Sequence, residues 1–272
     1  MLIASGLFHV GVYLFADGGL GGPVSWRKPI EFGLSGGITA LSLALLMARL
    51  PPVGALAWPC AVAISLFLPE VALIDLQRWR GVPSHFNDAT LFDSAVFGAM
   101  GILISLVSLA IVALTVWSFV SLRGPTSTAL AIRVGMVFLT LGQLLGFAIV
   151  TNGTSPGHDP LNASILGAAG EMKVPHAVAL HGLQVLGLLA LVLERSALAE
   201  AQLLALVLVA IAGYTLAFGV AIGQTFGGRA PADLTPLTLA GSLVAVALLA
   251  VAFGAALRAA RFAAAAGEAL AN

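Results

Sequence analysis

The stretch LFDSAVFGAMGILISLVSLAIVALTVWSFVSL, residues 91–122, carries a single charged residue, Asp93, and decides the class of the fold. A helix needs about 20 predominantly apolar residues to cross the hydrocarbon core of a bilayer, and this run is longer. A lipid-exposed backbone must satisfy its own hydrogen bonds, and the run lacks the apolar–polar alternation of a barrel strand. We therefore predict a transmembrane helix here, long enough to tilt or protrude.

The whole chain has the composition of a membrane protein. Of its 272 residues 60% are hydrophobic and 9% are charged, and the mean hydropathy is +1.05. Soluble domains carry about 25% charged residues. Further apolar runs lie near 1–17, 30–50, 54–77, 130–151, 174–194, 198–225 and 236–260. The sequence predicts an all-α, polytopic transmembrane helix bundle of about eight spans, forming a single domain over residues 1–272 in the lipid bilayer of a bacterial inner membrane.

The charge and cysteine content exclude several classes of function. Twelve basic and twelve acidic residues balance to zero, so the chain lacks the basic patch of a nucleic-acid-binding protein. The single cysteine, Cys60, lies in an apolar run and cannot form an internal disulfide. The apolar pattern continues after the N-terminal segment, which we interpret as a retained first span rather than a cleaved signal peptide. The composition leaves two kinds of partner besides lipid possible: a small-molecule ligand, and a second copy of the chain or another subunit.

Polar residues gather at one predicted membrane face. If eight spans alternate in direction, nine of the twelve acids fall on one face: Asp17, Glu31, Glu70, Asp75, Asp88, Asp93, Asp159, Glu171 and Asp233. Four of the five histidines fall there too: His85, His158, His176 and His181. Basic residues divide evenly between the faces, so the positive-inside rule gives no orientation. We expect the acid-rich face to be external, because the loops at the other face are short and their charged residues are mostly arginines without neighbouring acids.

Glu70 is the clearest ionisable residue inside a predicted span. Such residues are costly, at about 2.5–3.5 kcal/mol each on insertion scales, and therefore suggest function. Gln77 lies seven residues further on, about two helical turns away on the same face. Two interpretations remain: Glu70 pairs with an arginine such as Arg80 or Arg27 to lock helices together, or it serves in ligand binding or proton transfer.

The segment SWRKPIEFG, residues 25–33, opens the second span. Its tryptophan suits the membrane interface, and Pro29 fits the first turn of a helix. Arg27 and Lys28 are natural headgroup anchors. Alternatively, one of them holds an anionic group, such as a haem propionate or a substrate carboxylate. Close by, Gly33 and Gly37 have the four-residue spacing that lets helices approach closely, within one bundle or between two copies.

The segment QRWRGVPSHFNDATLFD, residues 77–93, is unusually rich in functional groups for a connector. Gly81 and Pro83 predict a turn, and Asn87 or Asp88 can cap the next helix. Capping does not account for His85 or for Asp93 one turn into that helix.

The segment EMKVPHAVALHGLQ, residues 171–184, contains two further histidines. His181 and Gln184 are three residues apart and share one helix face, whereas His176 and His181 are five apart and point about 140° away from each other. This spacing differs from the i, i+4 pair of HExxH enzymes. The two histidines must therefore serve different ligands, or one of them binds at the mouth of the site and the other inside it.

WRKPIEFG, RWRGVPSHFN and VPHAVALHGLQ together resemble motifs of a group of bacterial polytopic membrane proteins with no established activity. The group has Gly-Asp before the last motif and Pro-His-Phe within it, whereas this chain has Gly170-Glu171 and Ala177 after His176. The resemblance covers about half the chain. It implies membership rather than an activity, and it implies a shared core of Arg27, Lys28, Arg80, His85, His176, His181 and Gln184.

A haem- or metal-binding protein with a redox or sensing role is our first functional hypothesis. Imidazole is the commonest metal ligand, so His9 and His181 are candidate axial ligands of haem b, with Arg27 or Lys28 on its propionates. Alternatively, a mixed site for a transition metal ion draws on Glu70, His85, His176 and His181.

Three other classes compete with it. A transporter needs a polar path, for which the candidates are Glu70, Gln77, Asp93, Gln143, His181, Gln184 and Gln224. A membrane enzyme would use histidine and carboxylate groups in acid–base catalysis. A structural subunit of a larger complex would need none of these residues.

Overall fold

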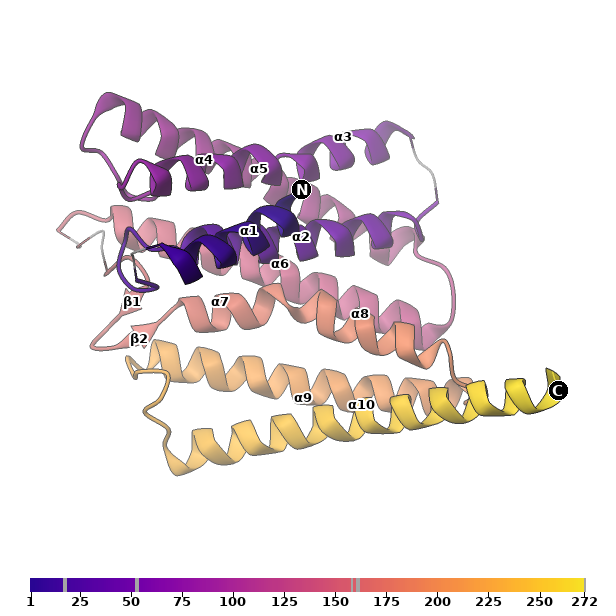
Figure 1. Cartoon of the computed structure of the whole chain (residues 1–272). Coiled ribbons are helices and arrows are strands. Elements are labelled where there is room, and N and C mark those ends of the chain that lie inside the picture. Colours follow the sequence, from indigo (N-terminus) through magenta and orange to yellow (C-terminus); the bar gives the residue numbers. More distant parts are fainter. Residues whose placement is uncertain (17–18, 52–53, 158, 160–161, 272) are drawn as a thin grey trace. The chain divides into compact units, whose positions relative to one another are not determined.

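The computed structural model describes residues 1–16, 19–51, 54–157, 159 and 162–271, and most of these are helical (Figure 1). Seven of the described helical segments are long and apolar enough to cross a membrane, and the first helix is a shorter apolar one. The predicted all-α bundle of about eight spans is therefore confirmed. His158 and Asp17, which we assigned to the acid-rich face, lie outside the described residues.

The chain folds as two compact units. Unit 1 comprises Met1–Val116 with Pro156–Leu161, and unit 2 comprises Trp117–Ser155 with Asn162–Asn272. Unit 1 contains α1 (Leu2–Phe15), α2 (Arg27–Met47), α3 (Gly54–Ser65), α4 (Phe67–Trp79) and most of α5 (Leu91–Ser121). Unit 2 contains α6 (Thr126–Thr154), β1 (Ile165–Leu166), β2 (Gly170–Glu171), α7 (Lys173–Leu180), α8 (Gly182–Leu193), α9 (Glu200–Phe226) and α10 (Pro236–Ala271).

Two predicted spans are each broken into two helices. The third span changes from α3 to α4 at Ser65–Leu66, and the sixth changes from α7 to α8 at His181, whose φ of −85° and ψ of 1° depart from helical values. Near the first break, Pro69 has no N–H to donate to the carbonyl four residues earlier, which favours a new helix start. The sequence predicted each of these spans as one continuous helix, and in this respect the prediction is wrong.

In unit 1, α1 packs closely on α2 through glycine. A Cβ at Gly33 would lie 2.7 Å from the backbone nitrogen of Gly6, and one at Gly37 would lie 2.6 Å from the Ile3 side chain. The Gly33–Gly37 spacing therefore serves packing within the bundle. The similar glycines Gly219 and Gly223 have open space around them, so they mark no close approach between described helices.

The buried face of α4 carries Phe67, Glu70, Val71, Ile74 and Gln77. These positions recur every three or four residues, so they form one stripe along the helix. Ile74 packs on α5 with Val96 and Met100, against Phe32 of α2. The predicted shared face of Glu70 and Gln77 is confirmed, and both side chains point into the protein.

Unit 2 has an apolar core between α6, α8, α9 and α10, and Figure 1 shows α9 and α10 side by side. Between α6 and α7 the chain forms a two-stranded antiparallel hairpin, β1–β2. The Thr225 hydroxyl at the end of α9 donates to the Glu171 carbonyl over 3.1 Å and fastens this hairpin. At the other end of the unit, the Glu200 carboxylate accepts from the Ser127 backbone N–H at 2.7 Å and caps α6.

Each unit gathers its predicted acid-rich loops at one end. In unit 1, Lys28 after the first loop donates to Ser84 in the loop between α4 and α5, over 3.5 Å. In unit 2, the Ala169 N–H of the hairpin loop donates to the Gly228 carbonyl over 3.0 Å. Within each unit, the loops that we assigned to the acid-rich membrane face therefore lie at the same end, as predicted.

Candidate functional site

Three consecutive residues at the end of α4, Arg78-Trp79-Arg80, reach three different partners in unit 1. The Arg78 guanidinium lies over the Trp26 ring, 3.6 Å from its centroid. Trp79 donates its indole N–H to His9, and Arg80 pairs with Asp93. From the sequence we selected Arg80 as a candidate ligand-binding residue and assigned no role to Arg78 or Trp79. In the structure all three residues organise the polar end of unit 1.

The Asp93 carboxylate is the centre of a buried hydrogen-bond network. Its Oδ1 accepts from Gln77 Nε2 at 2.9 Å and from Arg80 Nη1 at 2.6 Å, while its Oδ2 accepts from the Thr90 hydroxyl at 2.6 Å. Arg80 also donates to Gln77 Oε1. Three of our predicted ligand-binding residues, Gln77, Arg80 and Asp93, thus bind one another and join α4 to α5.

The cap of α5 differs from our prediction. Thr90, rather than Asn87 or Asp88, accepts the Asp93 backbone N–H through its hydroxyl at 3.1 Å. Asn87 instead shapes the preceding loop, donating to the Pro83 carbonyl and accepting from the Ala89 N–H. The spacing Thr-x-x-Asp before an apolar run resembles a capping box and would have identified Thr90 from sequence.

His9 is held by hydrogen bonds at both ring nitrogens. Indole nitrogen only donates, so Nε2, 3.1 Å from Trp79 Nε1, must accept. Nδ1 then carries the proton and donates to the Ser5 carbonyl at 2.9 Å. The Ser5 hydroxyl in turn donates to Asp75 Oδ2 at 2.9 Å. An axial haem ligand needs a free nitrogen lone pair, so His9 could ligate iron only after losing the bond from Trp79.

His85 lies in an aromatic setting in the loop between α4 and α5. Its ring centroid is 5.6 Å from that of Phe32 and 6.1 Å from that of Phe97. Nδ1 lies 2.9 Å from the Ser84 hydroxyl. Burial, together with the nearby charge of Lys28, lowers the pKa of His85 to about 3, so its imidazole is neutral at physiological pH.

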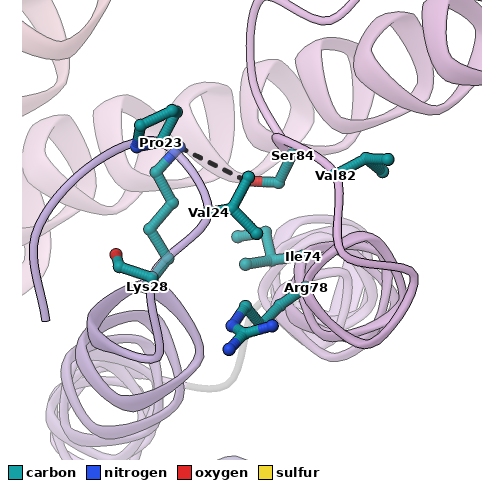
Figure 2. Close-up of a pocket in the computed structure, with 8 residues that line it drawn as sticks. Pro23, Val24, Lys28, Ile74, Arg78, Val82 and Ser84 are labelled. Carbon is teal, nitrogen blue, oxygen red and sulfur yellow. Dashed lines mark hydrogen bonds between the residues drawn. The ribbon is translucent and has the colours of Figure 1, made fainter. Parts of the chain in front are cut away.

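A narrow crevice separates the start of α2 from the end of α4 (Figure 2). Its empty volume is about 150 Å³ including open solvent, without interior room for a water molecule. The polar side chains that line it are Ser25, Lys28, Arg78 and Ser84. Ser25 Oγ and Arg78 Nε are both buried, and neither has a hydrogen-bond partner among the described residues. In Figure 2 the Lys28 side chain reaches across to Ser84, with Arg78 projecting from α4.

Sequence analysis selected only Lys28 from this crevice. Ser25, Arg78 and Ser84 stand inside the quoted motifs, but we assigned them no role. Each is adjacent to, or two residues from, a predicted site residue, which was the available signal. Arg27, the other predicted anion holder, instead lies 3.7 Å from Glu31 one turn along α2.

Of our two interpretations of Glu70, the pairing with an arginine is not found among the described residues. Arg80 binds Asp93, and Arg27 faces Glu31. The Glu70 residue is 3% exposed, and within unit 1 no described residue donates a hydrogen bond to its carboxyl group. The reason lies in position along the helix, since Arg80 is ten residues away and on the order of 15 Å along the axis.

In unit 2, His176 and His181 differ in their surroundings. His176 Nδ1 lies 2.8 Å from the Gly142 carbonyl, which can only accept, so the proton is on Nδ1. His181 is exposed at the break between α7 and α8. Gln184, which follows it on α8, is half-buried. The two histidines thus serve different surroundings, as their spacing predicted.

The four predicted metal-ligating histidines are divided between the units, with His9 and His85 in unit 1 and His176 and His181 in unit 2. Among the described residues, no three histidine, cysteine or acidic side chains gather into a metal site. Haem and transition-metal binding therefore stay predictions, as does the mixed site that includes Glu70.

Comparisons of the whole chain with protein-family models, with curated proteins and with solved structures found no match. The resemblance of the three motifs to a bacterial membrane protein group accordingly stays a prediction. The plain conclusion from fold and composition is that the chain is a multi-pass membrane protein.

Proposed function

We propose that this membrane protein binds an anionic group, a carboxylate or a phosphate, in the crevice between α2 and α4 of unit 1. The observation that carries the proposal is the pair of buried donors without a partner, Ser25 Oγ and Arg78 Nε. Both line the same crevice as the ammonium group of Lys28.

The energetics of unsatisfied donors support an anion as the missing partner. A buried donor left without an acceptor costs about 1–3 kcal/mol, and more when it is charged. Stacking on Trp26 occupies the face of the Arg78 guanidinium and leaves its N–H edge for an acceptor. The N-terminus of α2 begins beside Lys28 and adds a partial positive charge.

Because the crevice has no interior room for a water molecule, a bound anion must widen it, and this favours a small ligand group. Lys28 reaches Ser84 over 3.5 Å, at the long limit of a hydrogen bond, so an anion can displace this contact at little cost. A carboxylate or phosphate can come from a soluble metabolite, a lipid headgroup or a haem propionate. The last would unite this site with the predicted haem b cofactor. A transporter or an acid–base enzyme would use the same site to hold its substrate.

The test measures anion-dependent stabilisation of the purified protein in detergent. Inorganic phosphate, acetate and succinate are titrated while the thermal unfolding midpoint is recorded. A ligand at a hundredfold excess over its Kd stabilises the folded state by about 2.7 kcal/mol. Lys28→Gln and Arg78→Gln should abolish the shift. Arg195→Gln, an exposed arginine on α8's following loop, is the matched control and should retain it.

Two further measurements separate the sources of the anion. Native mass spectrometry of protein from nanodiscs with and without phosphatidylglycerol detects a retained acidic lipid, and an absorption spectrum detects haem. Loss of lipid or haem in Arg78→Gln, but not in Arg195→Gln, would assign the source. Equal behaviour of wild type and Arg78→Gln toward soluble anions, acidic lipid and haem would refute the proposal.

A further inference from the structure

We propose that Glu70 is a proton-binding site within the third span, carrying an exchangeable proton as a neutral carboxylic acid. The inference goes beyond anion binding and rests on different residues. It starts from the position of Glu70, which is 3% exposed in the first turn of α4, directly after the break between α3 and α4.

The other ionisable groups on Glu70's own helix lie further along it and contact other residues. Asp75 accepts from Ser5 at 2.9 Å and lies 4.0 Å from His9. Arg78 lies over Trp26. At 1.5 Å per residue, Asp75 is about 7.5 Å and Arg78 about 12 Å further along the helix axis, toward the polar end. Neither charge is therefore a direct partner of Glu70.

Among the described residues, no basic side chain of the helices packed against α4 forms an ion pair with Glu70. Residues 32–47 of α2 and residues 94–116 of α5 contain no acidic, basic or histidine residue. The titratable groups of these neighbours are Arg27, Lys28 and Glu31 in the first turns of α2, the α-amino group of Met1 with His9 and Tyr13 on α1, Cys60 on α3 and Asp93 on α5. The Met1 amino group forms no ion pair with Glu70. Of these, Arg27 faces Glu31, Lys28 reaches Ser84, His9 is bonded to Ser5 and Trp79, and Asp93 is paired with Arg80.

An unpaired carboxylate is strongly disfavoured in such surroundings. The charged form loses its hydration, and among the residues of unit 1 that the structure describes, no cation or array of N–H donors replaces that hydration. Taking up a proton removes the charge and so relieves the penalty. Asp93 is equally buried but has Arg80, Gln77 and Thr90 on its oxygens, so it remains a carboxylate. Glu70 and Asp93, the two buried acids among the described residues of unit 1, are thus a natural pair for comparison.

The experiment uses dicyclohexylcarbodiimide, a membrane-soluble reagent that adds to protonated carboxyl groups. The acid adds across one C=N bond of the reagent, its proton moves to nitrogen, and the adduct rearranges to a stable N-acylurea. We expect peptide mass mapping of the full-length protein in lipid to find the adduct on Glu70 and not on Asp93. Labelling should fall by about tenfold for each pH unit above the midpoint of the titration.

Infrared spectroscopy provides an independent readout that does not depend on access of the reagent. The C=O stretch of a protonated carboxylic acid should be present in the wild type, shift in D₂O because the proton exchanges, and disappear in Glu70→Gln. Asp93→Asn should leave this band unchanged.

Three outcomes would overturn the inference. The first is that the wild type gives neither the Glu70 adduct nor the acid band. The second is that the acid band survives in Glu70→Gln. The third is that Na⁺ at constant pH prevents labelling of Glu70, which would make it a metal-cation site. Anion binding is measured in parallel, and Glu70→Gln should leave the phosphate-dependent shift unchanged, so the two proposals fail separately.

Discussion

At the scale of single residues, the basic side chains of Arg80, Arg78 and Lys28 differ in chemistry because each contacts a different kind of group. Arg80 meets a carboxylate and becomes part of a closed network. Arg78 meets an aromatic face and keeps a donor without a partner. Lys28 meets a serine hydroxyl. The sequence identified Arg80 and Lys28 as polar-site residues but could not distinguish a satisfied group from an unsatisfied one.

His85 predicts a pH dependence of stability. Its pKa is lowered from 6.5 to about 3 in the folded protein, chiefly by burial. Between these values the unfolded chain binds the proton more strongly, so folding is penalised as the medium becomes acidic. The contribution of His85 to stability should be complete above pH 6.5 and be lost progressively toward pH 3.

Thermal unfolding between pH 7.5 and 4.5 measures this effect. The wild type should lose stability on acidification more steeply than His85→Gln, which cannot be protonated in this range. Parallel pH profiles for the two proteins would show that His85 is not the group responsible.

Thr90 predicts a capping contribution at the start of α5. Thr90→Ala removes the acceptor for the Asp93 N–H and one donor to the Asp93 carboxylate. Loss of a side-chain N-cap costs about 1 kcal/mol of the free energy of unfolding. Chemical denaturation should show a loss of this size, and a larger one for Asp93→Ala. Thr154→Ala is the control, because Thr154 is exposed and its hydroxyl bonds only to carbonyls of its own helix; an equal loss there would contradict the assignment.

At the scale of elements, glycine positions decide how closely helices pack. The hydropathy of residues 1–17 and 30–50 predicted two spans, but the structure shows that α1 touches α2 backbone to backbone at Gly6 and Gly33. The spacing of Gly33 and Gly37 predicted a close contact. It did not identify the partner helix, because every apolar helix nearby is a candidate.

Gly33→Ala should therefore weaken the packing of α1 on α2. The new methyl group would lie 2.7 Å from the Gly6 nitrogen, and backbone cannot move aside as a flexible side chain can. Overpacking of this kind costs about 1–3 kcal/mol. Gly11→Ala on α1 has open space around it and serves as the control. The two variants are compared by thermal unfolding in detergent, and equal midpoints would argue against the backbone contact.

At the scale of the whole molecule, eight spans predict a definite sidedness. Single cysteines placed at the exposed positions Asp88 and Ala168 should react with a membrane-impermeant maleimide from one side of the membrane. Cysteines at the exposed positions Arg123 and Ala197 should react from the other. Cys60→Ala provides the background. If the cysteines at Asp88 and Ala168 were labelled from opposite sides, an odd number of spans would have to lie between them. The two histidine-containing segments would then lie on opposite faces of the membrane.

The sequence by itself determined the membrane class, the helical fold and the approximate limits of the spans. The physical reason is that the fate of an apolar run in lipid depends on local sequence alone. A run of sufficient length must satisfy its own backbone hydrogen bonds and therefore becomes a helix. The grouping of acids and histidines at one end of each unit followed from counting those runs.

Only the tertiary structure decided which polar groups are satisfied. The bonds from Ser5 to Asp75 and from Trp79 to His9 each join residues 70 positions apart, and the Lys28–Ser84 contact joins residues 56 apart. No local spacing encodes such pairs, since they depend on which helix faces meet. The same meeting of faces leaves two donor atoms, Ser25 Oγ and Arg78 Nε, buried without a hydrogen-bond partner among the described residues, and it buries Glu70 away from any described cation. For this reason the candidate sites emerged from the fold.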